Sequence, residues 1–427
     1  MKFLTEIGRV LYEGSRAHAD WEIKTANTIL RSRKRLLVLG LLLLPILIGG
    51  VVFADQLVGG LPEYLGGKTA YSPSFFTMRV FLASIAIGLC AGLITGCIGA
   101  GGGFIIAPAL MSAGIKGILA VGTDLFHIFA KAIMGSVLHK KLGNISVALA
   151  LIFLIGSGVG ATLGGWINRL LYDFNPIISD AFITTIYVVM LGALGLYSLT
   201  DFFKARKAQD GGGSAHGGKD EGTEMGNLPR KLQAMNIPPM VTFDQGIIPG
   251  GRRISSWFLI LSGFLVGLCA SIMGVGGGFL TFPIFVYVLG VSSMTTVGTD
   301  IFQIIFTAGY SAIGQYAIYG FIFYTLAMGM LLGSLLGIQI GALSTKVVKG
   351  ITIRGFYAMA VLAGFANRLF ALPSKLSSVG AFPLSKETAA IFDTIGIWLF
   401  FVLISIFALW VIGTFVMNIK KLKGEEA

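Results

Sequence analysis

The chain has 427 residues, of which 55% are hydrophobic and 12% are charged, and its mean hydropathy is +0.84. This composition excludes an ordinary water-soluble domain, because it supplies many segments near the roughly 20 apolar residues that cross a hydrocarbon core of about 30 Å. The formal charge of +12 at pH 7 does not indicate nucleic-acid binding, since the basic residues lie in loops and at chain ends rather than in a basic domain with interleaved aromatics. The sequence therefore predicts an all-α polytopic membrane protein.

The chain opens on a charged leader, residues 1–35. Apolar residues recur in it at roughly helical spacing, which favours an amphipathic cytoplasmic helix along the membrane surface over a helix that binds a cytosolic partner. The first apolar run begins only behind this leader, so no cleavable signal peptide is expected. Residues 36–53 are predicted to form an extra N-terminal transmembrane helix.

Further apolar segments follow along the rest of the chain. They cover residues 77–98, 103–115, 118–138, 145–170, 181–202, 255–274, 279–290, 296–318, 321–344, 354–372 and 391–417. Two of them, 103–115 and 279–290, are too short to cross a bilayer comfortably. The last, 391–417, is predicted to be an extra C-terminal transmembrane helix.

One signature occurs twice. A GxGGGF motif stands at residues 99–104 and again at 274–279, each time followed by a proline four residues later and then by a Val-Gly-Thr-Asp element, at 121–124 and 297–300. The offset between the copies drifts only from 175 to 177 residues over these motifs and a later Gly-Ser pair. This match predicts an internal duplication.

Each glycine-rich break comes just before a short apolar segment. We expect each short segment and its successor to form a broken helical hairpin, whose irregular backbone faces a protein-lined cavity because it cannot face lipid. A glycine-rich break in corresponding places of two apolar halves is typical of a transporter's binding site.

The positions of Lys and Arg predict the orientation. The basic clusters are Arg31, Arg33, Lys34 and Arg35; Lys140 and Lys141; Lys204, Arg206, Lys207, Arg252 and Arg253; Lys346, Lys349 and Arg354; and Lys420, Lys421 and Lys423. All fall on one side if each hairpin starts and ends on the same face, so both termini are expected to be cytoplasmic. The repeats, residues 77–202 and 255–372, then have inverted topology.

The central stretch, residues 203–253, is polar and rich in glycine, above all at 211–218. This composition predicts a flexible cytoplasmic loop without a folded domain.

The glycine motifs favour an anion site. A glycine-rich turn that leads into a helix exposes unpaired N–H groups at the positive end of the helix dipole. The candidate donors are Gly101, Gly102, Gly103, Gly276, Gly277 and Gly278. The alternative is close helix packing, and we favour binding because glycine clusters followed by proline disrupt a packed helix. For the glycines at four-residue spacing, 156–164 and 333–341, packing is the better interpretation. A dinucleotide fingerprint is excluded, since no strand precedes the motif.

Three ionisable residues share one helix face in the first copy. Asp124, His127 and Lys131 occur at i, i+3 and i+7, and the second copy has Asp300, Gln303 and Thr307 in these places. An ionisable residue inside a span costs roughly 2.5–3.5 kcal/mol on insertion scales, so the stripe should face a cavity.

Each stripe residue has two interpretations. Thr123 with Asp124, and Thr299 with Asp300, either line the site or cap a helix start. His127 is either a proton carrier or a packing residue. Lys131 either attracts an anion or extends toward the cytoplasmic face. Arg368, near a span end, is expected to anchor at the membrane interface.

With both elements present in two copies, residues 77–372 resemble the TauE/SafE family of membrane permeases, known as sulfite exporters. The resemblance implies inverted repeats and transport of small sulfur-containing anions, such as sulfite, thiosulfate or organosulfonates, across a bacterial inner membrane. Composition and spacing alone indicate only a two-fold site suited to an anion.

We therefore expect a secondary transporter that works by alternating access in the lipid bilayer. The sequence contains no ATP-binding P-loop, so a proton or Na+ gradient, or the substrate's own gradient, is expected to drive it. Neither a cofactor nor a bound metal is expected. The alternatives are an anion channel on the same fold and, with less support, a membrane sensor or enzyme, since the sequence lacks paired carboxylates or a metal cluster for catalysis.

Overall fold

The computed structural model describes residues 62–65, 78–98, 102–141, 146–210, 227–244, 250–344, 347–348, 350–381 and 383–418. The predicted leader at 1–35, the predicted helix at 36–53 and Gly101 lie outside the described residues.

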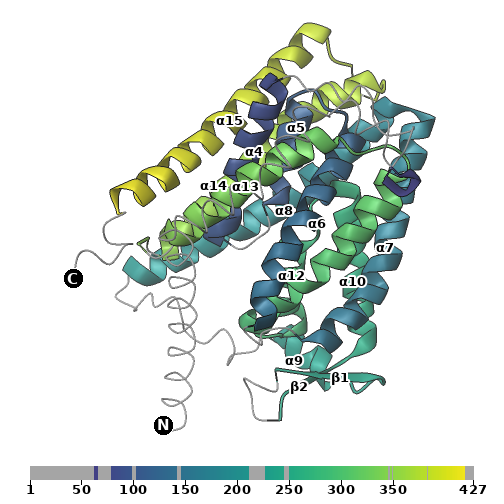
Figure 1. The fold of residues 1–427 in the computed structure, drawn as a ribbon, viewed down its shortest axis with the longest axis vertical. Helices are drawn as coiled ribbons and strands as arrows, with labels where there is room; N and C mark the ends of the chain where they lie inside the picture. Colours follow the sequence, from purple (N-terminus) through teal and green to yellow (C-terminus); the bar gives the residue numbers. More distant parts are fainter. Residues whose placement is uncertain are drawn as a thin grey trace.

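Helices make up most of the described chain (Figure 1). A 3-10 turn, η1 (Glu63–Leu65), is followed by α4 (Met78–Ile98), α5 (Gly103–Ser112), α6 (Gly117–Lys141), α7 (Val147–Phe174), α8 (Pro176–Asp210), α9 (Asn227–Ala234), α10 (Ser256–Met273), α11 (Gly278–Pro283), α12 (Ser293–Tyr310), α13 (Tyr324–Ser344), α14 (Gly350–Ser378) and α15 (Lys386–Met417). Two π-helical segments, η3 (Ile284–Leu289) and η4 (Ser311–Ala317), continue α11 and α12. Within the described ranges, seven helices are long and apolar enough to cross a membrane: α4, α7, α8, α10, α13, α14 and α15.

The two short segments form the predicted hairpins. Helix α5 has ten residues and turns into α6 after four residues. Helix α11 has six residues and continues through η3 before the chain turns into α12. Both short helices contain the repeated proline, Pro108 and Pro283. The structure thus confirms two broken hairpins in corresponding places.

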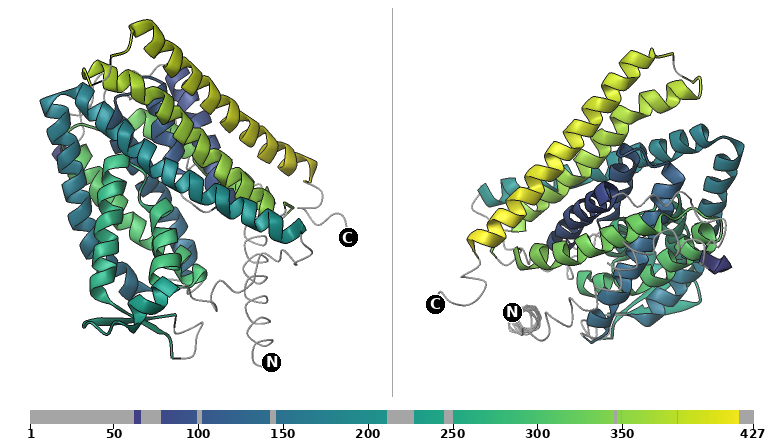
Figure 2. Two further views of the ribbon diagram at one scale, coloured as in Figure 1. Left: turned by 180° about the vertical axis from the view of Figure 1, so that it is seen from behind. Right: turned by 45° about the horizontal axis from the view of Figure 1, so that its top comes forward.

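Helices from the two halves pack in reciprocal pairs. Helix α4 packs on α13, and α7 packs on α10. Figure 1 and Figure 2 show α8, α13, α14 and α15 running diagonally across the bundle, while α6, α7, α10 and α12 are steeper. Helix α15 covers α14 at the outside of the bundle.

The glycines at four-residue spacing make these contacts possible. A Cβ added at Gly160 would lie 2.1 Å from the Phe264 carbonyl oxygen of α10, and one at Gly337 would lie 2.3 Å from the Leu89 carbonyl oxygen of α4. Both distances are too short for any side chain, so the backbones approach as closely as glycine allows. The packing interpretation of these glycines is confirmed.

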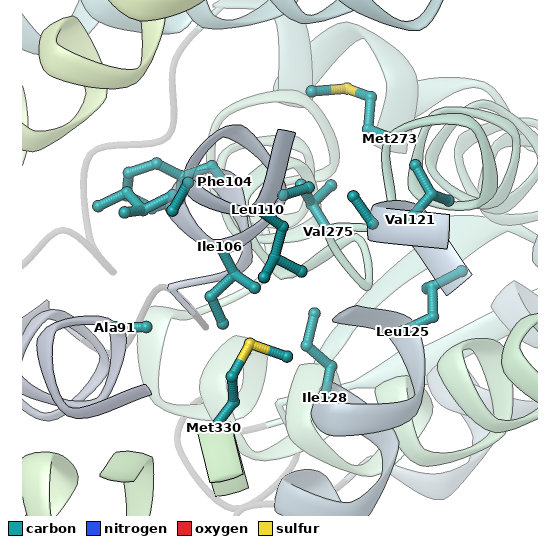
Figure 3. Packing of buried hydrophobic residues seen from close by; sticks show 14 of the residues in the cluster. Ala91, Phe104, Ile106, Leu110, Val121, Leu125, Ile128, Met273, Val275 and Met330 are labelled. Carbon is teal, nitrogen blue, oxygen red and sulfur yellow. The ribbon is translucent and has the colours of Figure 1, made fainter. Parts of the chain in front are cut away.

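The interior between the helix pairs is a large apolar cluster, part of which Figure 3 shows from close by. There Ile106 of α5, Ile128 of α6 and Met330 of α13 point toward one another. Val275, from the second glycine-rich break, belongs to the same cluster. The described residues of the two breaks, 102–104 and 274–279, are buried in protein, as irregular backbone requires in lipid.

The central stretch departs from expectation. Helix α8 extends to Asp210, α9 follows at Asn227–Ala234, and β1 (Met240–Phe243) pairs with β2 (Arg252–Ser255) as an antiparallel hairpin with Val241 opposite Ile254. Alternate apolar residues of this hairpin pack on α7, α10 and η3, which stabilises it by burial. The prediction of a flexible loop was wrong for residues 227–244 and 250–253, and the described chain is helical with one small sheet rather than strictly all-α.

Candidate functional site

The two glycine-rich breaks meet. A Cβ added at Gly103, the first residue of α5, would lie 3.1 Å from the Val275 Cα in the second break. Both breaks also approach the side chain of Ile128. A Cβ added at Gly103 would lie 2.8 Å from Ile128 Cδ1, and one added at Gly276 would lie 2.7 Å from Ile128 Cγ2. Figure 3 shows Ile128 and Val275 at this meeting point. The starts of α5 and α11 are thus brought to one place.

Left-handed backbone at each break requires glycine. Gly102 precedes α5 with φ 65°, and Gly277 precedes α11 with φ 89°. An L-residue avoids this region because its Cβ crowds the following carbonyl oxygen. Space is also lacking, since a Cβ at Gly102 would lie 2.6 Å from the Ala91 carbonyl oxygen and one at Gly277 would lie 2.7 Å from Val266 Cγ1.

Side chains from three other elements hold the chain just before the second break. Asn168 of α7 donates to the Ile272 carbonyl oxygen at 3.0 Å, and Tyr316 of η4 donates to that of Ser271 at 2.6 Å. The hydroxyl of Tyr187, from α8, donates to the Met273 carbonyl oxygen. These bonds satisfy carbonyls that the end of α10 leaves without a helical partner. The sequence analysis did not identify these three residues, although the lone amide of Asn168 inside an apolar span indicates a functional or structural role.

The Thr-Asp pairs do not cap their own helices. Helix α6 begins at Gly117, whose N–H donates to Asp180 of α8, and α12 begins after Ser292, which caps it. The pairs at 123–124 and 299–300 therefore lie in the second turn. The capping interpretation was wrong because the start of each helix lies further toward the N-terminus than the glycine of the motif suggested.

The two threonines instead tie the halves together. Thr123 Oγ1 accepts the N–H of Phe323, just before α13, at 2.9 Å. Thr299 Oγ1 accepts the N–H of Ser146, just before α7, at 3.0 Å. Each hydroxyl thus satisfies a backbone donor at the start of a helix in the other half of the chain.

Thr123→Val should destabilise the protein by about 1–3 kcal/mol, because it removes the hydroxyl that accepts the buried Phe323 N–H at nearly unchanged volume. Thr123→Ser keeps the acceptor and is the matched control. Thermal unfolding of both purified variants in detergent measures the difference. Equal melting temperatures for valine and serine variants would contradict this role.

The first stripe forms a buried polar cluster. Asp124 and His127 are 0% and 1% exposed, and His127 Nδ1 lies 3.6 Å from Asp124 Oδ1. On its other side, His127 Nε2 lies 2.9 Å from Ser334 Oγ of α13. Among the described residues, no side chain lies within hydrogen-bonding geometry of either Asp124 oxygen or of His127 Nδ1, while the backbone N–H of Ala107 in α5 interacts with the Asp124 carboxylate.

Lys131 lies beside the first break. It is 9% exposed, and its Nζ donates to Thr95 Oγ1 near the end of α4 at 3.2 Å. A Cβ at Gly102 would lie 2.7 Å from that same Thr95 oxygen. The ammonium therefore lies in the interior near the start of α5, which favours attraction of an anion over extension toward the surface.

Hydrogen bonds join the polar side chains of the second stripe, residues Asp300, Gln303 and Thr307, in a continuous series. Gln303 Nε2 donates to Asp300 Oδ1 at 2.9 Å, and Thr307 Oγ1 donates to Gln303 Oε1 at 2.8 Å. Thr307 Oγ1 is in turn 3.0 Å from Ser157 Oγ of α7. The other Asp300 oxygen lies 3.2 Å from the place of a Cβ on Gly278, so the carboxylate stands at the start of α11, where the helix dipole favours negative charge.

Each stripe bonds a serine from the other half. Ser334 contacts the first stripe and Ser157 contacts the second. The signal was present, because both serines belong to the repeated Gly-Ser pairs. The sequence showed them only as part of a packing stripe, since the exchange of helices between halves is a tertiary feature.

Arg368 is not an interface anchor. It is 3% exposed and donates to the Pro108 carbonyl oxygen at 3.3 Å and to Ser112 Oγ at 2.9 Å. The expectation was wrong because the last turn of the short helix α5 needs a donor for its free carbonyls.

A cavity of about 880 Å³ lies elsewhere, between α8, α14 and α15, with lining residues such as Phe202, Met359 and Leu403.

Comparison with known proteins identifies the family of the chain. A sequence model of the family described as sulfite exporter TauE/SafE matches residues 84–368. The probable membrane transporter protein YunE of Bacillus subtilis (strain 168) is 26% identical over 281 residues, covering 64% of this chain and 91% of that protein. The probable membrane transporter protein YjnA of the same organism is 27% identical over 262 residues, covering 60% and 87%.

A more distant likeness is to the sulfite exporter TauE/SafE family protein 6 of Arabidopsis thaliana, which is 38% identical over 74 residues, or 17% of each chain. No solved structure gives a significant match. The family match covers well over half of the chain and includes both glycine-rich breaks and both stripes. The chain therefore belongs to the sulfite exporter TauE/SafE family and is a multi-pass membrane transporter rather than an enzyme.

Proposed function

We propose that the protein is a secondary transporter that moves a small sulfur-containing anion, such as sulfite, thiosulfate or an organosulfonate, by alternating access. The observation that carries this proposal is the meeting of the two breaks at Gly103 and Val275, with the Lys131 ammonium close by. Free N–H groups at helix starts and a buried cation suit an oxyanion. Sulfur enters through the family description alone.

The two repeats, residues 77–202 and 255–372, are proposed to be related by a twofold axis in the membrane plane. Reciprocal contacts support this relation, because α4 pairs with α13 as α10 pairs with α7. The threonine bonds to Phe323 and Ser146, and the serine contacts of the two stripes, are reciprocal in the same way. Inverted repeats of this kind place a substrate near the middle of the bilayer.

The residues proposed to line the site come from both repeats. They are Gly101, Gly102, Gly103, Thr123, Asp124, His127, Lys131, Gly276, Gly277, Gly278, Thr299, Asp300 and Gln303. The starts of α5 and α11 present donors, while the aspartates oppose a bare anion and so call for a cation, a proton or Na+, to accompany it. The protein is proposed to act in a bacterial inner membrane with both termini cytoplasmic.

Uptake into proteoliposomes tests the function. Purified protein is reconstituted with a panel of labelled sulfite, thiosulfate, sulfate and organosulfonates, with protein-free vesicles as the control. We expect uptake of at least one sulfur anion, accelerated by the same unlabelled anion inside, since a carrier exchanges its substrate. Flux without such counterflow would indicate a channel, and no flux of any panel member under any gradient would overturn the proposal.

A further inference from the structure

The first stripe contains a place for one proton. Asp124 and His127 face each other at 3.6 Å, which is beyond hydrogen-bond distance. The carboxylate oxygens and the facing ring nitrogen all lack hydrogen-bond partners among the described side chains, although both residues are buried. Unpaired buried polar groups of this kind are costly and uncommon.

The partner of the other ring nitrogen determines what the facing nitrogen can do. Ser334 Oγ donates its hydrogen to the Leu331 carbonyl oxygen at 3.1 Å, so it accepts from His127 Nε2–H at 2.9 Å. A neutral His127 then has a lone pair at Nδ1. This lone pair faces Asp124 Oδ1, and two acceptors facing each other repel unless one proton lies between them.

The second stripe has no such place. Gln303 stands where the first stripe has His127, and its amide both donates to Asp300 and accepts from Thr307. In this series of hydrogen bonds each acceptor faces a donor, so no added proton is required between two acceptors. The two halves of one duplicated design therefore differ at the position that decides whether a proton can bind.

In the described part of the chain, few charged or titratable groups lie near Asp124 and His127. Lys131 on the same helix and Tyr187 of α8 interact with Asp124 electrostatically. Other titratable side chains on the neighbouring elements have contacts of their own, among them Asp300 of α12 with Gln303, Tyr316 of η4 with Ser271, and Tyr324 of α13 with Leu65. Helix α5 contributes the backbone N–H of Ala107, which interacts with the Asp124 carboxylate, and no titratable residue.

We infer that Asp124 and His127, supported by Ser334, bind the coupling proton, and that only the first half of the chain carries this site. The inference rests on the proposed function and assigns its coupling ion. The proton comes from water on one side of the membrane, bonds between Asp124 Oδ1 and His127 Nδ1, and leaves to water on the other side. Ser334 belongs to α13, so the proton site lies at a contact between the two halves.

His127→Gln tests the inference, because it gives the first stripe the residue that the second stripe has. Proton and anion movement are measured together in proteoliposomes with a pH-sensitive dye and labelled substrate. We expect the ratio of protons to anions moved to fall by about tenfold or more, since glutamine does not titrate. The ratio is independent of any general loss of rate. Ser179→Ala, which removes another buried hydroxyl without a partner, should leave it unchanged.

A ratio unchanged in His127→Gln would overturn the inference, as would transport that follows a Na+ gradient and ignores a pH gradient. A second measurement needs no substrate and so separates this inference from the proposed function. Infrared difference spectra of the membrane-embedded protein between acid and alkaline pH should show a buried carboxyl band that disappears in Asp124→Asn and remains in Asp300→Asn. Persistence of the band in Asp124→Asn would also overturn the inference.

Discussion

Replacing Gly102 by valine is expected to reduce transport to the level of empty vesicles. The left-handed backbone at this position costs an L-residue roughly 1–2 kcal/mol, and the added Cβ would lie 2.6 Å from the Ala91 carbonyl oxygen. The start of α5 must therefore move away from α4 and from the second break. Gly277→Val should act in the same way, because its Cβ would lie 2.7 Å from Val266 Cγ1. Substrate uptake per amount of monodisperse protein measures the effect.

Gly114 supplies a matched control. Its φ of +89° is also left-handed, but a Cβ added there meets nothing within 4 Å. Gly114→Val thus introduces the same kind of backbone strain without a clash at the breaks, and it should retain most of the transport. If Gly102→Val and Gly114→Val transport equally well, the close approach of the first break to α4 is irrelevant to function.

Asp300→Asn is expected to lower transport by about tenfold or more while the protein remains folded. The amide keeps the shape of the carboxylate but removes the negative charge at the start of α11, where the dipole and Gln303 both favour an anion. Asp124→Asn should impair transport to a similar degree, because it removes one member of the buried pair with His127. Initial uptake rates, set against the amount of purified protein, measure both.

Asp173→Asn is the control for loss of a carboxylate, since Asp173 is exposed near the end of α7. It should transport like the unaltered protein. Normal transport by both Asp124→Asn and Asp300→Asn would place the functional site away from the stripes.

Much of the architecture could be predicted from the residues alone, because it depends on local periodicity and on duplication. The apolar segments indicated the spans, and the repeated glycine motifs indicated two broken hairpins. The repeat also identified Asp124 and Asp300 as equivalent positions. Spacing of three and four residues placed the stripe residues on shared helix faces, and the structure shows them as neighbours.

The rest depends on contacts between distant parts of the chain. Ser334 forms a hydrogen bond with His127 because α13 of one half packs beside α6 of the other, which local sequence does not indicate. Arg368 near a predicted span end gave no sign that it binds the end of α5. The hairpin of β1 and β2 was missed because each strand has only four residues, and its burial depends on the surfaces of α7 and η3.

The central claim is that one small anion binds where the two helix starts meet. A cryo-electron microscopy structure of the protein in lipid nanodiscs, with and without a saturating transported sulfur anion, tests it most directly. We expect added density next to the backbone of Gly102–Gly103 and Val275–Gly277, within reach of Lys131. Density found instead only in a distant cavity, such as that between α8, α14 and α15, would contradict it.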